Sequence, residues 1–236
     1  MMFHASKLDK NYTFNFENKF EEITIKSFDK INLHGLLFKS EKSKGLIFYL
    51  HGNQGAVDSW RNISKIYTDL GYDIFILDYR SFGKSEGDIE SEKQFNTDIS
   101  FVYKKLISRY SEKETIIIGY SIGTGPATIL ASKNNPKALI LQAPYFNFVE
   151  LAGAQVPFVP HFLYKFKFET NCYISKIKAP IYLFHGNKDQ LISYSNSFRL
   201  KKLLKPTDAF FILQNQDHIG INENEDFQNQ LKIILK

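Results

Sequence analysis

The chain has 236 residues, 43% of them hydrophobic, which is enough for one large domain with a sizeable core. Its formal net charge is +5, but only four of its 30 basic residues are arginine and the lysines are spread along the chain, so we expect no nucleic-acid partner. The single cysteine, Cys172, excludes an internal disulfide, and no metal-ligand cluster forms around it, so we expect no bound metal.

Strand-like and helix-like segments alternate along the chain. The first two, 21–27 and 31–38, alternate apolar and polar residues and predict an opening antiparallel hairpin. Later segments that are short and almost continuously apolar, as strands buried on both faces of a parallel sheet are, lie at 45–50, 73–78, 115–119, 138–142, 180–186 and 209–214. Helical patterns lie at 56–70, 92–109, 122–133, 192–204 and 223–235.

This order of segments predicts an α/β domain with a mostly parallel, doubly wound sheet and an antiparallel start. We expect residues 1–20 to form an N-terminal tail and residues 21–236 to form a single domain. The segment 143–175 has no clear strand, so a short cap would lie there. Its many aromatic residues either line an acyl pocket or pack an irregular crossover on the sheet, and both interpretations stay open.

The sequence "GYSIGTG" at 119–125 could form either a phosphate-binding loop or a turn that carries a nucleophilic serine. No G-x-G-x-x-G pattern is present there, and "GKS" at 83–85 lacks the Walker glycine five positions earlier, where Asp78 stands. A predicted strand ends at Gly119 and a predicted helix begins at Ile122. This strand–turn–helix context favours a nucleophile elbow with Ser121 in the turn, rather than a glycine-rich turn with an idle serine.

A serine hydroxyl needs a general base, and an orienting acid completes the group. His218 follows the last predicted strand by a few residues and is the best base. Asp189 follows the strand before it, so the chain order Ser121, Asp189, His218 is the one expected for an α/β-hydrolase. Asp217 is adjacent to His218, but neighbouring side chains usually point apart, which favours Asp189 as the acid.

The other five histidines are less suitable by position. His34 lies in the middle of a hairpin strand, which we expect to be far from the carboxyl edge of the sheet. His51 and His185 each precede a glycine at a strand end, where a packing or hydrogen-bonding role is commoner. The last two lie in the N-terminal tail and in the irregular segment (His4 and His161).

An acyl transfer also needs donors for the oxyanion. The sequence "HGNQG" at 51–55 follows the third predicted strand, where such enzymes contribute one backbone N–H. We predict that the two donors are the N–H groups of Asn53 and Ile122. The alternative is that 51–55 is only a glycine turn.

With these motifs the chain resembles the α/β-hydrolases, and more narrowly the small serine hydrolases with HGNxG, DYRxxGxSxG and GYSxGTG motifs. Here these read "HGNQG" (51–55), "DYRSFGKSEG" (78–87) and "GYSIGTG" (119–125), followed by "HGNKD" (185–189). The resemblance runs from about residue 20 to the end and implies the hydrolase fold. Eukaryotic members of this group include protein depalmitoylases and lipid hydrolases, so it does not identify one substrate.

Two positions depart from the pattern of that group, and the N-terminal segment resembles some of its members. Gln54 stands where relatives often have a small residue, and Ile219-Gly220 follows the histidine where relatives often have Asn-Asp. The N-terminal "FHASKLDKNYTF" resembles a segment that follows a membrane anchor in some relatives. The chain has no apolar run of about 20 residues and no signal peptide, so we expect a cytoplasmic protein. Membrane association is expected only through a missing N-terminal anchor, in a membrane-tethered longer form.

The sequence thus predicts a cofactor-independent serine hydrolase that cleaves a carboxylic ester or thioester of short to medium acyl chain through an acyl-enzyme. Its partner would be a small-molecule or acylated substrate. One alternative is a serine peptidase of the same fold, which would need a recognition site for an amine or peptide terminus. Another is a catalytically silent binding module, which a complete set of three residues argues against.

Overall fold

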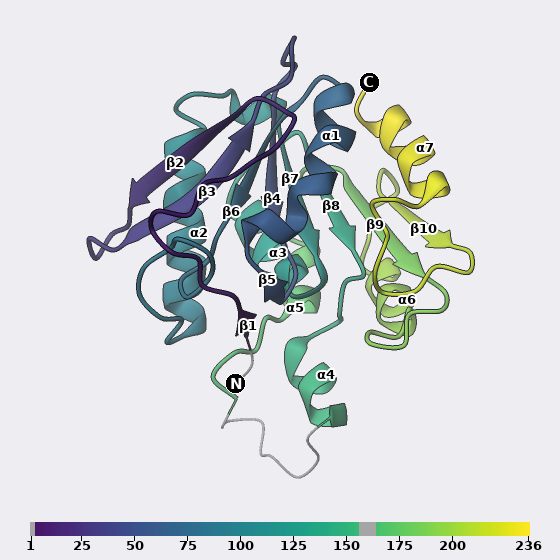
Figure 1. The fold of residues 1–236 in the computed structure, drawn as a ribbon. Helices are drawn as coiled ribbons and strands as arrows, with labels where there is room; N and C mark the ends of the chain where they lie inside the picture. Colours follow the sequence, from purple (N-terminus) through teal and green to yellow (C-terminus); the bar gives the residue numbers. More distant parts are fainter. Residues whose placement is uncertain (1–2, 156–163) are drawn as a thin grey trace.

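A computed structural model describes residues 3–155 and 164–236, which are built around one eight-stranded sheet (Figure 1). The strand order is β10-β9-β8-β7-β4-β6-β3-β2. The strands are β2 (Phe20–Lys26), β3 (Asn32–Phe38), β4 (Leu46–Leu50), β6 (Asp73–Leu77), β7 (Thr115–Tyr120), β8 (Ala138–Gln142), β9 (Ile181–Gly186) and β10 (Ala209–Leu213).

The pairing of the strands confirms the predicted mostly parallel sheet with an antiparallel start. β2 and β3 run antiparallel to each other, and β3 runs antiparallel to β6. The remaining neighbours, from β6 through β4, β7, β8 and β9 to β10, are parallel. The residues of β4, β6, β7 and β8 are all buried, which explains why these strands are continuously apolar in the sequence.

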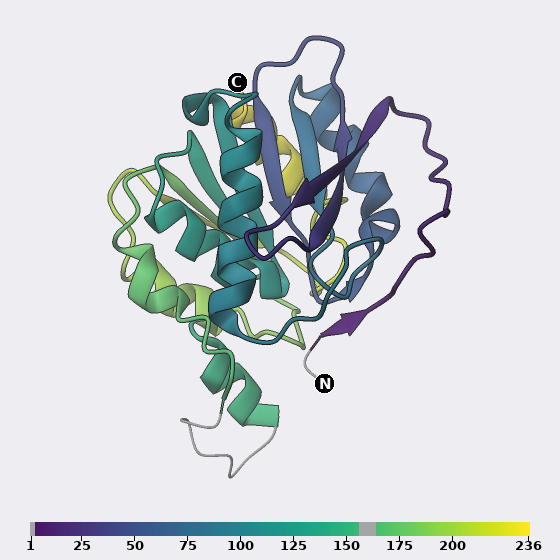
Figure 2. The ribbon, with the colours of Figure 1, turned by 90° about the vertical axis from the view of Figure 1, so that its left-hand side faces the viewer.

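Helices cover both faces of the sheet, as a doubly wound fold requires (Figure 2). They are α1 (Arg61–Asp69), α2 (Glu92–Leu106), α3 (Thr124–Ser132), α4 (Phe148–Gln155), α5 (Thr170–Ile174), α6 (Ser195–Lys201) and α7 (Glu225–Ile234). One core layer joins the sheet to α1 and α7, and the other joins it to α2, α3, α5 and α6. In the described part of the chain, no helix combines the length and the hydrophobicity that a bilayer span requires.

The N-terminal segment is tied to the domain by backbone pairing. The short strand β1 (His4–Ala5) runs parallel to β5 (Gln54–Gly55), directly after β4. The N–H of Ser6 donates to the carbonyl of Gly55 at 3.0 Å. Phe3 is buried in the same core layer as α2. The residues expected to form a tail therefore pack on the domain from residue 3 onward and contact the loop that follows β4.

The predicted cap region lies beyond the carboxyl ends of the strands, where α4 extends away from the sheet (Figure 1). Tyr145, Phe166 and Phe168 are buried in the core layer on the α3 side of the sheet. These three aromatic residues therefore pack on the sheet, as the crossover interpretation expects. Phe158, His161 and Phe162 lie outside the described residues, and the presence of a cap stays a prediction.

Candidate active site

The turn between β7 and α3 holds Ser121 in an unusual backbone conformation. Its φ is 53°, in the left-handed region that residues with a side chain rarely adopt. The turn is tightly packed: a Cβ added to Gly123 would lie 2.1 Å from the carbonyl oxygen of Leu50. A Cβ on Gly119 would lie 2.6 Å from the carbonyl oxygen of Gly123. The glycines of the G-x-S-x-G pattern are therefore required by this turn.

The structure brings Ser121, His218 and Asp189 together from three separate loops. The Nε2 atom of His218 lies 2.9 Å from the Oγ atom of Ser121. The Nδ1 atom of the same ring lies 2.7 Å from Oδ2 of Asp189. All three residues are buried, with exposed fractions of 7%, 8% and 6% for Ser121, His218 and Asp189. This arrangement is the one expected of a nucleophile, a base and an orienting acid.

The carboxylate of Asp189 is stabilised in its charged form. Its Oδ1 accepts hydrogen bonds from the N–H groups of Leu191 at 2.9 Å and Ile192 at 2.7 Å. Its Oδ2 lies between His218 and the Nε2 atom of His185, which is 3.2 Å away. Burial alone would raise the pKa of Asp189, but the hydrogen bonds from His185 and His218 outweigh it and hold that pKa well below its ordinary value.

Two other aspartates near the end of the chain make different contacts. The Oδ1 atom of Asp217 accepts the backbone N–H of His218 at 2.7 Å. Asp208 accepts the backbone N–H of Ile181, the first residue of β9, at 3.0 Å. Asp189 is therefore the aspartate that contacts the ring of His218.

The loops that carry Asn53 and Ile122 meet beside the serine. Asn53 lies just after β4, and Ile122 follows Ser121 directly. Gly123 packs so closely on the end of β4 that an added Cβ would also lie 2.8 Å from the carbonyl oxygen of His51. This contact holds the 51–55 loop against the turn. The role of the two N–H groups as oxyanion donors stays a prediction.

The ring of His34 has partners of its own, and the expectation that it lies far from the carboxyl edge of the sheet was wrong. Because β3 runs antiparallel, His34 lies beside Gly35, which pairs with the last residue of β6 at the carboxyl edge of the parallel strands. Its Nδ1 contacts Oδ2 of Asp78 at 3.0 Å. Two strands, β6 and β4, still lie between β3, which carries His34, and β7, the strand before Ser121.

The sequence did not predict the contact between His185 and Asp189. His185 is fully buried, its Nδ1 contacts Oγ of Ser197 at 2.7 Å and its Nε2 contacts the carbonyl of Ile192 at 2.7 Å. The available signal is the i, i+4 spacing in "HGNKD", where the turn after β9 brings the aspartate back beside the histidine.

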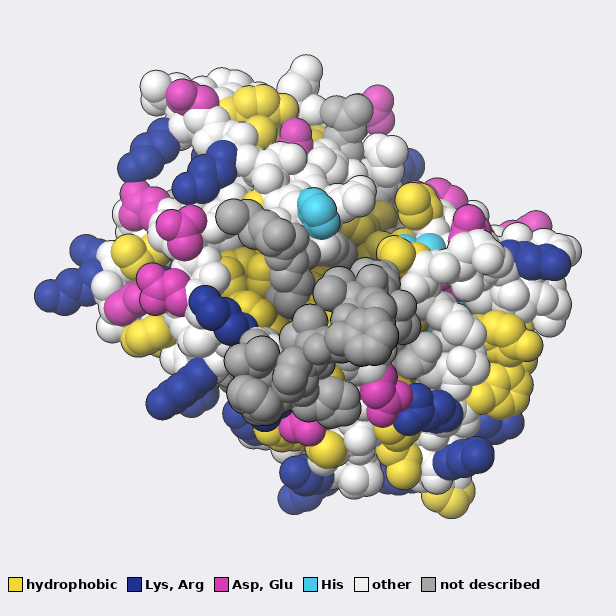
Figure 3. All heavy atoms as spheres, turned by 90° about the horizontal axis from the view of Figure 1, so that it is seen from below, with side chains coloured by type: hydrophobic (Ala, Val, Ile, Leu, Met, Phe, Trp, Pro, Cys, Tyr) yellow, Lys and Arg dark blue, Asp and Glu magenta, His cyan; other side chains and the backbone are white. Residues whose placement is uncertain are grey.

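The face beyond the carboxyl ends of the strands is the one seen in Figure 3. Hydrophobic side chains gather near its middle, and charged side chains lie around its rim (Figure 3). Two apolar residues close in the chain to Asp189 and His218 are exposed: Leu191, two residues after Asp189, is 53% exposed, and Ile219, directly after His218, is 80% exposed. The surroundings of the site therefore offer contacts to an apolar group.

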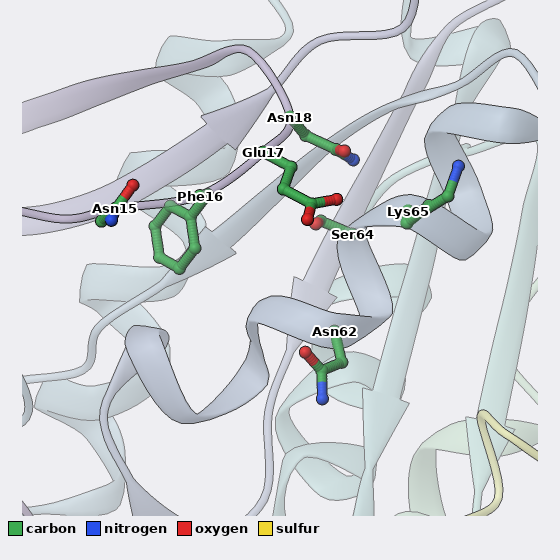
Figure 4. A pocket seen from close by; sticks show the side chains of 7 residues that line it. All are labelled: Asn15, Phe16, Glu17, Asn18, Asn62, Ser64 and Lys65. Atoms are coloured by element: carbon green, nitrogen blue, oxygen red, sulfur yellow. The ribbon is translucent and has the colours of Figure 1, made fainter.

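An open hollow of about 360 Å³ lies elsewhere, between the N-terminal segment and α1 (Figure 4). It is lined mostly by polar side chains: Asn15, Phe16, Glu17, Asn18, Asn62, Ser64 and Lys65. None of them belongs to the group around Ser121, so this hollow is separate from the candidate active site. Within residues 3–155 and 164–236, no three metal-ligating side chains come together.

Comparison with known proteins shows the family and the fold to which the chain is similar. The model of the Hydrolase_4 family, described as serine aminopeptidase, S33, matches residues 41–171. Lysophosphatidylserine lipase ABHD12 of Danio rerio is 31% identical over 69% of this chain and 48% of its own length. Human alpha/beta hydrolase domain-containing protein 17B is 31% identical over 73% of this chain and 60% of its own length. The chain thus spans about half to three fifths of these relatives.

A solved structure resembles almost the whole chain. The Pyrococcus furiosus esterase Pf2001 has a TM-score of 0.79 and 20% sequence identity. The similarity covers 99% of this chain and 96% of the esterase. At this identity the match concerns the fold, which is the one that the sequence motifs predicted.

Proposed function

The chain belongs to the Hydrolase_4 family of α/β-hydrolases, and from this membership we propose that it is a serine hydrolase acting on a carboxylic ester or thioester. The observation that carries the proposal is the continuous contact from Oγ of Ser121 through His218 to Asp189. Burial of all three residues supports it, because the contacts are shielded from competing water.

In the proposed first step, Oγ of Ser121 attacks the carbonyl carbon while Nε2 of His218 accepts the hydroxyl proton. The resulting imidazolium is stabilised by the carboxylate of Asp189, which accepts a hydrogen bond from its Nδ1–H. The tetrahedral intermediate then collapses: the bond to the leaving oxygen or sulfur breaks, and His218 gives its proton to that atom. A water molecule, deprotonated by His218, then attacks the acyl-enzyme, and the acid leaves as Ser121 regains its proton.

The negative charge on the carbonyl oxygen needs stabilisation in both steps. We propose the N–H groups of Asn53 and Ile122 as its donors. The first turn after β7 supports this, because unpaired N–H groups at the start of a helical segment favour developing negative charge. The required chemistry uses only protein groups, so we propose no cofactor.

The proposed substrate carries a short or medium acyl chain. The exposed side chains of Leu191 and Ile219 lie within two residues of Asp189 and His218 in the chain, which supports an apolar group on the substrate. The aromatic residues Tyr145, Phe166 and Phe168 pack in the core, so they are not free to roof a long chain. Two relatives have names that denote a lipase and a hydrolase domain, which supports an ester class without extending their substrates to this chain.

A panel of p-nitrophenyl esters from acetate to palmitate, with an acyl-CoA and a short peptide amide, tests the proposed class. We expect the highest kcat/KM at short or medium chain length. A steady rise up to palmitate would contradict the chain-length proposal. Preference for the peptide would instead favour the peptidase alternative that the family description suggests.

Labelling by a fluorophosphonate probe tests the nucleophile. We expect the probe to modify Ser121 and the Ser121→Ala variant to lose both labelling and esterase activity, while its thermal midpoint changes little because one hydroxyl is removed from the turn. Mass spectrometry of the labelled peptide identifies the modified residue. A wild-type protein that neither labels nor turns over any of these substrates would favour a silent binding module.

A further inference from the structure

Thr124 binds the peptide group that contains one proposed oxyanion donor. Its Oγ1 donates a hydrogen bond to the carbonyl oxygen of Ser121 at 2.6 Å, and Thr124 is fully buried. The carbonyl of Ser121 and the N–H of Ile122 belong to the same planar peptide group and point in opposite directions. A bond that fixes the carbonyl therefore also fixes the direction of the N–H.

His51 makes the corresponding contact with the other proposed donor. Its Nδ1 lies 2.7 Å from the carbonyl oxygen of Gly52, which shares a peptide group with the N–H of Asn53. A carbonyl oxygen only accepts, so Nδ1 must carry the proton. Nε2 has no hydrogen-bond partner among the described residues, which suits a nitrogen without a hydrogen.

The ring of His51 is held rigidly. It is fully buried and lies 4.3 Å from the ring centroid of Tyr79 and 5.2 Å from that of Phe82. The hydroxyl of Tyr79 also donates to the carbonyl of His51 at 3.0 Å. Burial lowers the pKa of His51 and keeps its ring neutral near pH 7. The Nδ1–H is thus a fixed donor and is not needed to move a proton in the reaction.

We infer that His51 and Thr124 are positioning residues. Each of them bonds the carbonyl oxygen of one peptide group and thereby fixes the N–H of that group, which binds the oxyanion. This role rests on the proposed function, and it identifies the residues that orient the N–H groups of Asn53 and Ile122. A hydrogen bond on the carbonyl also polarises the peptide group and makes its N–H a stronger donor. Donors that are fixed before the reaction stabilise developing charge without reorganising.

A threonine that bonds a carbonyl one turn earlier is common in helices, so a matched control is needed. Thr128 provides it, because it is also fully buried in α3 and its Oγ1 donates to the carbonyl of Thr124 at 2.8 Å. The peptide group that Thr128 contacts is not one of the two proposed donors. Replacing either threonine by valine keeps the shape and removes the hydroxyl, so the variants differ in which peptide group loses its partner.

The first experiment compares Thr124→Val with Thr128→Val. Measurements are kcat and KM on a p-nitrophenyl ester, the inhibition constant of a trifluoromethyl ketone, and the thermal midpoint. We expect Thr124→Val to lower kcat by about tenfold or more with KM little changed, since an oxyanion donor acts mainly in the transition state. The ketone, which forms an oxyanion on Ser121, should lose affinity by a similar factor. Thr128→Val should lower the thermal midpoint without either effect.

The second experiment compares His51→Asn with His51→Leu, which have nearly the same shape and lose the same ring packing. The asparagine amide can return an N–H close to the place of Nδ1, whereas leucine cannot. We expect His51→Asn to exceed His51→Leu by about tenfold in kcat and in ketone affinity, at similar thermal midpoints. Because His51 is buried, both variants lose stability, so only the ratio of their kcat values and ketone affinities is interpreted. The comparison of the two threonine variants does not depend on this result.

Failure of this inference differs from failure of the proposed function. If wild-type protein turns over esters and labels at Ser121, but Thr124→Val and Thr128→Val have equal kcat and equal ketone affinity, the positioning role is wrong and the hydrolase stands. If wild-type protein shows neither turnover nor labelling, the proposed function fails, and the inference fails with it.

Discussion

At the scale of single residues, Asp189 and Asp217 have the same side chain but different contacts, because they occupy different positions in the fold. Asp189 contacts the ring of His218. Among the residues that the structure describes, Asp217 instead accepts from backbone N–H groups, those of His218 at 2.7 Å and Gln190 at 3.4 Å. A carboxylate on the ring fixes the tautomer and stabilises the imidazolium. A carboxylate on the backbone shapes the loop and has no such role.

The two aspartates should therefore respond differently to replacement by asparagine. Asp189→Asn presents an amide that stabilises the wrong tautomer, and we expect kcat to fall by about 10³–10⁴-fold. Asp217→Asn retains an oxygen that can accept the same backbone N–H groups, so we expect a loss of less than about tenfold. Steady-state kinetics on one ester measures both. The reverse order of losses would transfer the role of the acid to Asp217.

Several features of the site were readable from the sequence because they depend on local chain order. Ser121 lies in a strand–turn–helix pattern with glycines on both sides, and Asp189 and His218 each follow a buried strand. The contact of His185 with Asp189 was missed, since a histidine before a glycine gives no sign of where its ring points. The contacts of His51 and Thr124 with neighbouring carbonyls were also beyond reach, because they depend on side-chain rotamers.

At the scale of elements, the eight strands of the large sheet were predictable to within one residue at each end. Burial on both faces leaves a continuous apolar pattern in central strands such as β4 and β6, whereas the half-exposed β2 shows the alternating pattern. The helix starts were less accurate. The segment predicted as helical from residue 56 begins with the 3-10 turn Val57–Trp60, and α3 is preceded by another, Ser121–Gly123. The pairing of β1 with β5 joins two-residue strands about 50 positions apart, and no periodicity can reveal strands of that length.

That pairing predicts a link between the N-terminal segment and catalysis. The Ser6→Pro variant removes the N–H that bonds Gly55 and should loosen the loop that carries Asn53. We expect kcat on an ester substrate to fall several-fold, with a modest loss of thermal stability. Leu8→Pro is the control, because the N–H of Leu8 bonds the carbonyl of Gly83 and leaves the β1–β5 pair intact. Equal kcat values for both variants would mean that the pairing of β1 with β5 does not affect catalysis.

At the scale of the whole molecule, a set of buried polar groups links strands β4 and β8 to the segment before α7. Gln142, Asn222 and Tyr49 form one such group: the amide of Gln142 donates to Asn222 at 2.8 Å and accepts from the hydroxyl of Tyr49 at 3.0 Å. Every member of this group is bonded, as buried polar groups in native proteins usually are. His51 differs, because one of its ring nitrogens has no partner in the described residues.

That difference predicts how the stability of the molecule depends on pH. The pKa of His51 in the folded protein lies below its ordinary value of 6.5, chiefly because burial disfavours the charged ring, so the unfolded chain binds a proton more readily. The folded state therefore has its full stability above about pH 6.5 and loses stability as the pH falls below that value, by at most about 1.4 kcal/mol per pH unit for one proton. Urea unfolding between pH 5 and 7.5 measures the slope.

The slope of the wild-type protein includes every other titrating group, so the difference from His51→Asn isolates this one. The asparagine does not titrate, and the variant should lose less stability than wild type between pH 6.5 and 5, even though it is less stable at pH 7.5. Parallel curves for the two proteins would mean that His51 accepts a proton in the folded state as readily as in the unfolded chain. In that case the ring would not be the fixed, neutral donor that the carbonyl of Gly52 requires, and the positioning of the Asn53 peptide group would need another cause.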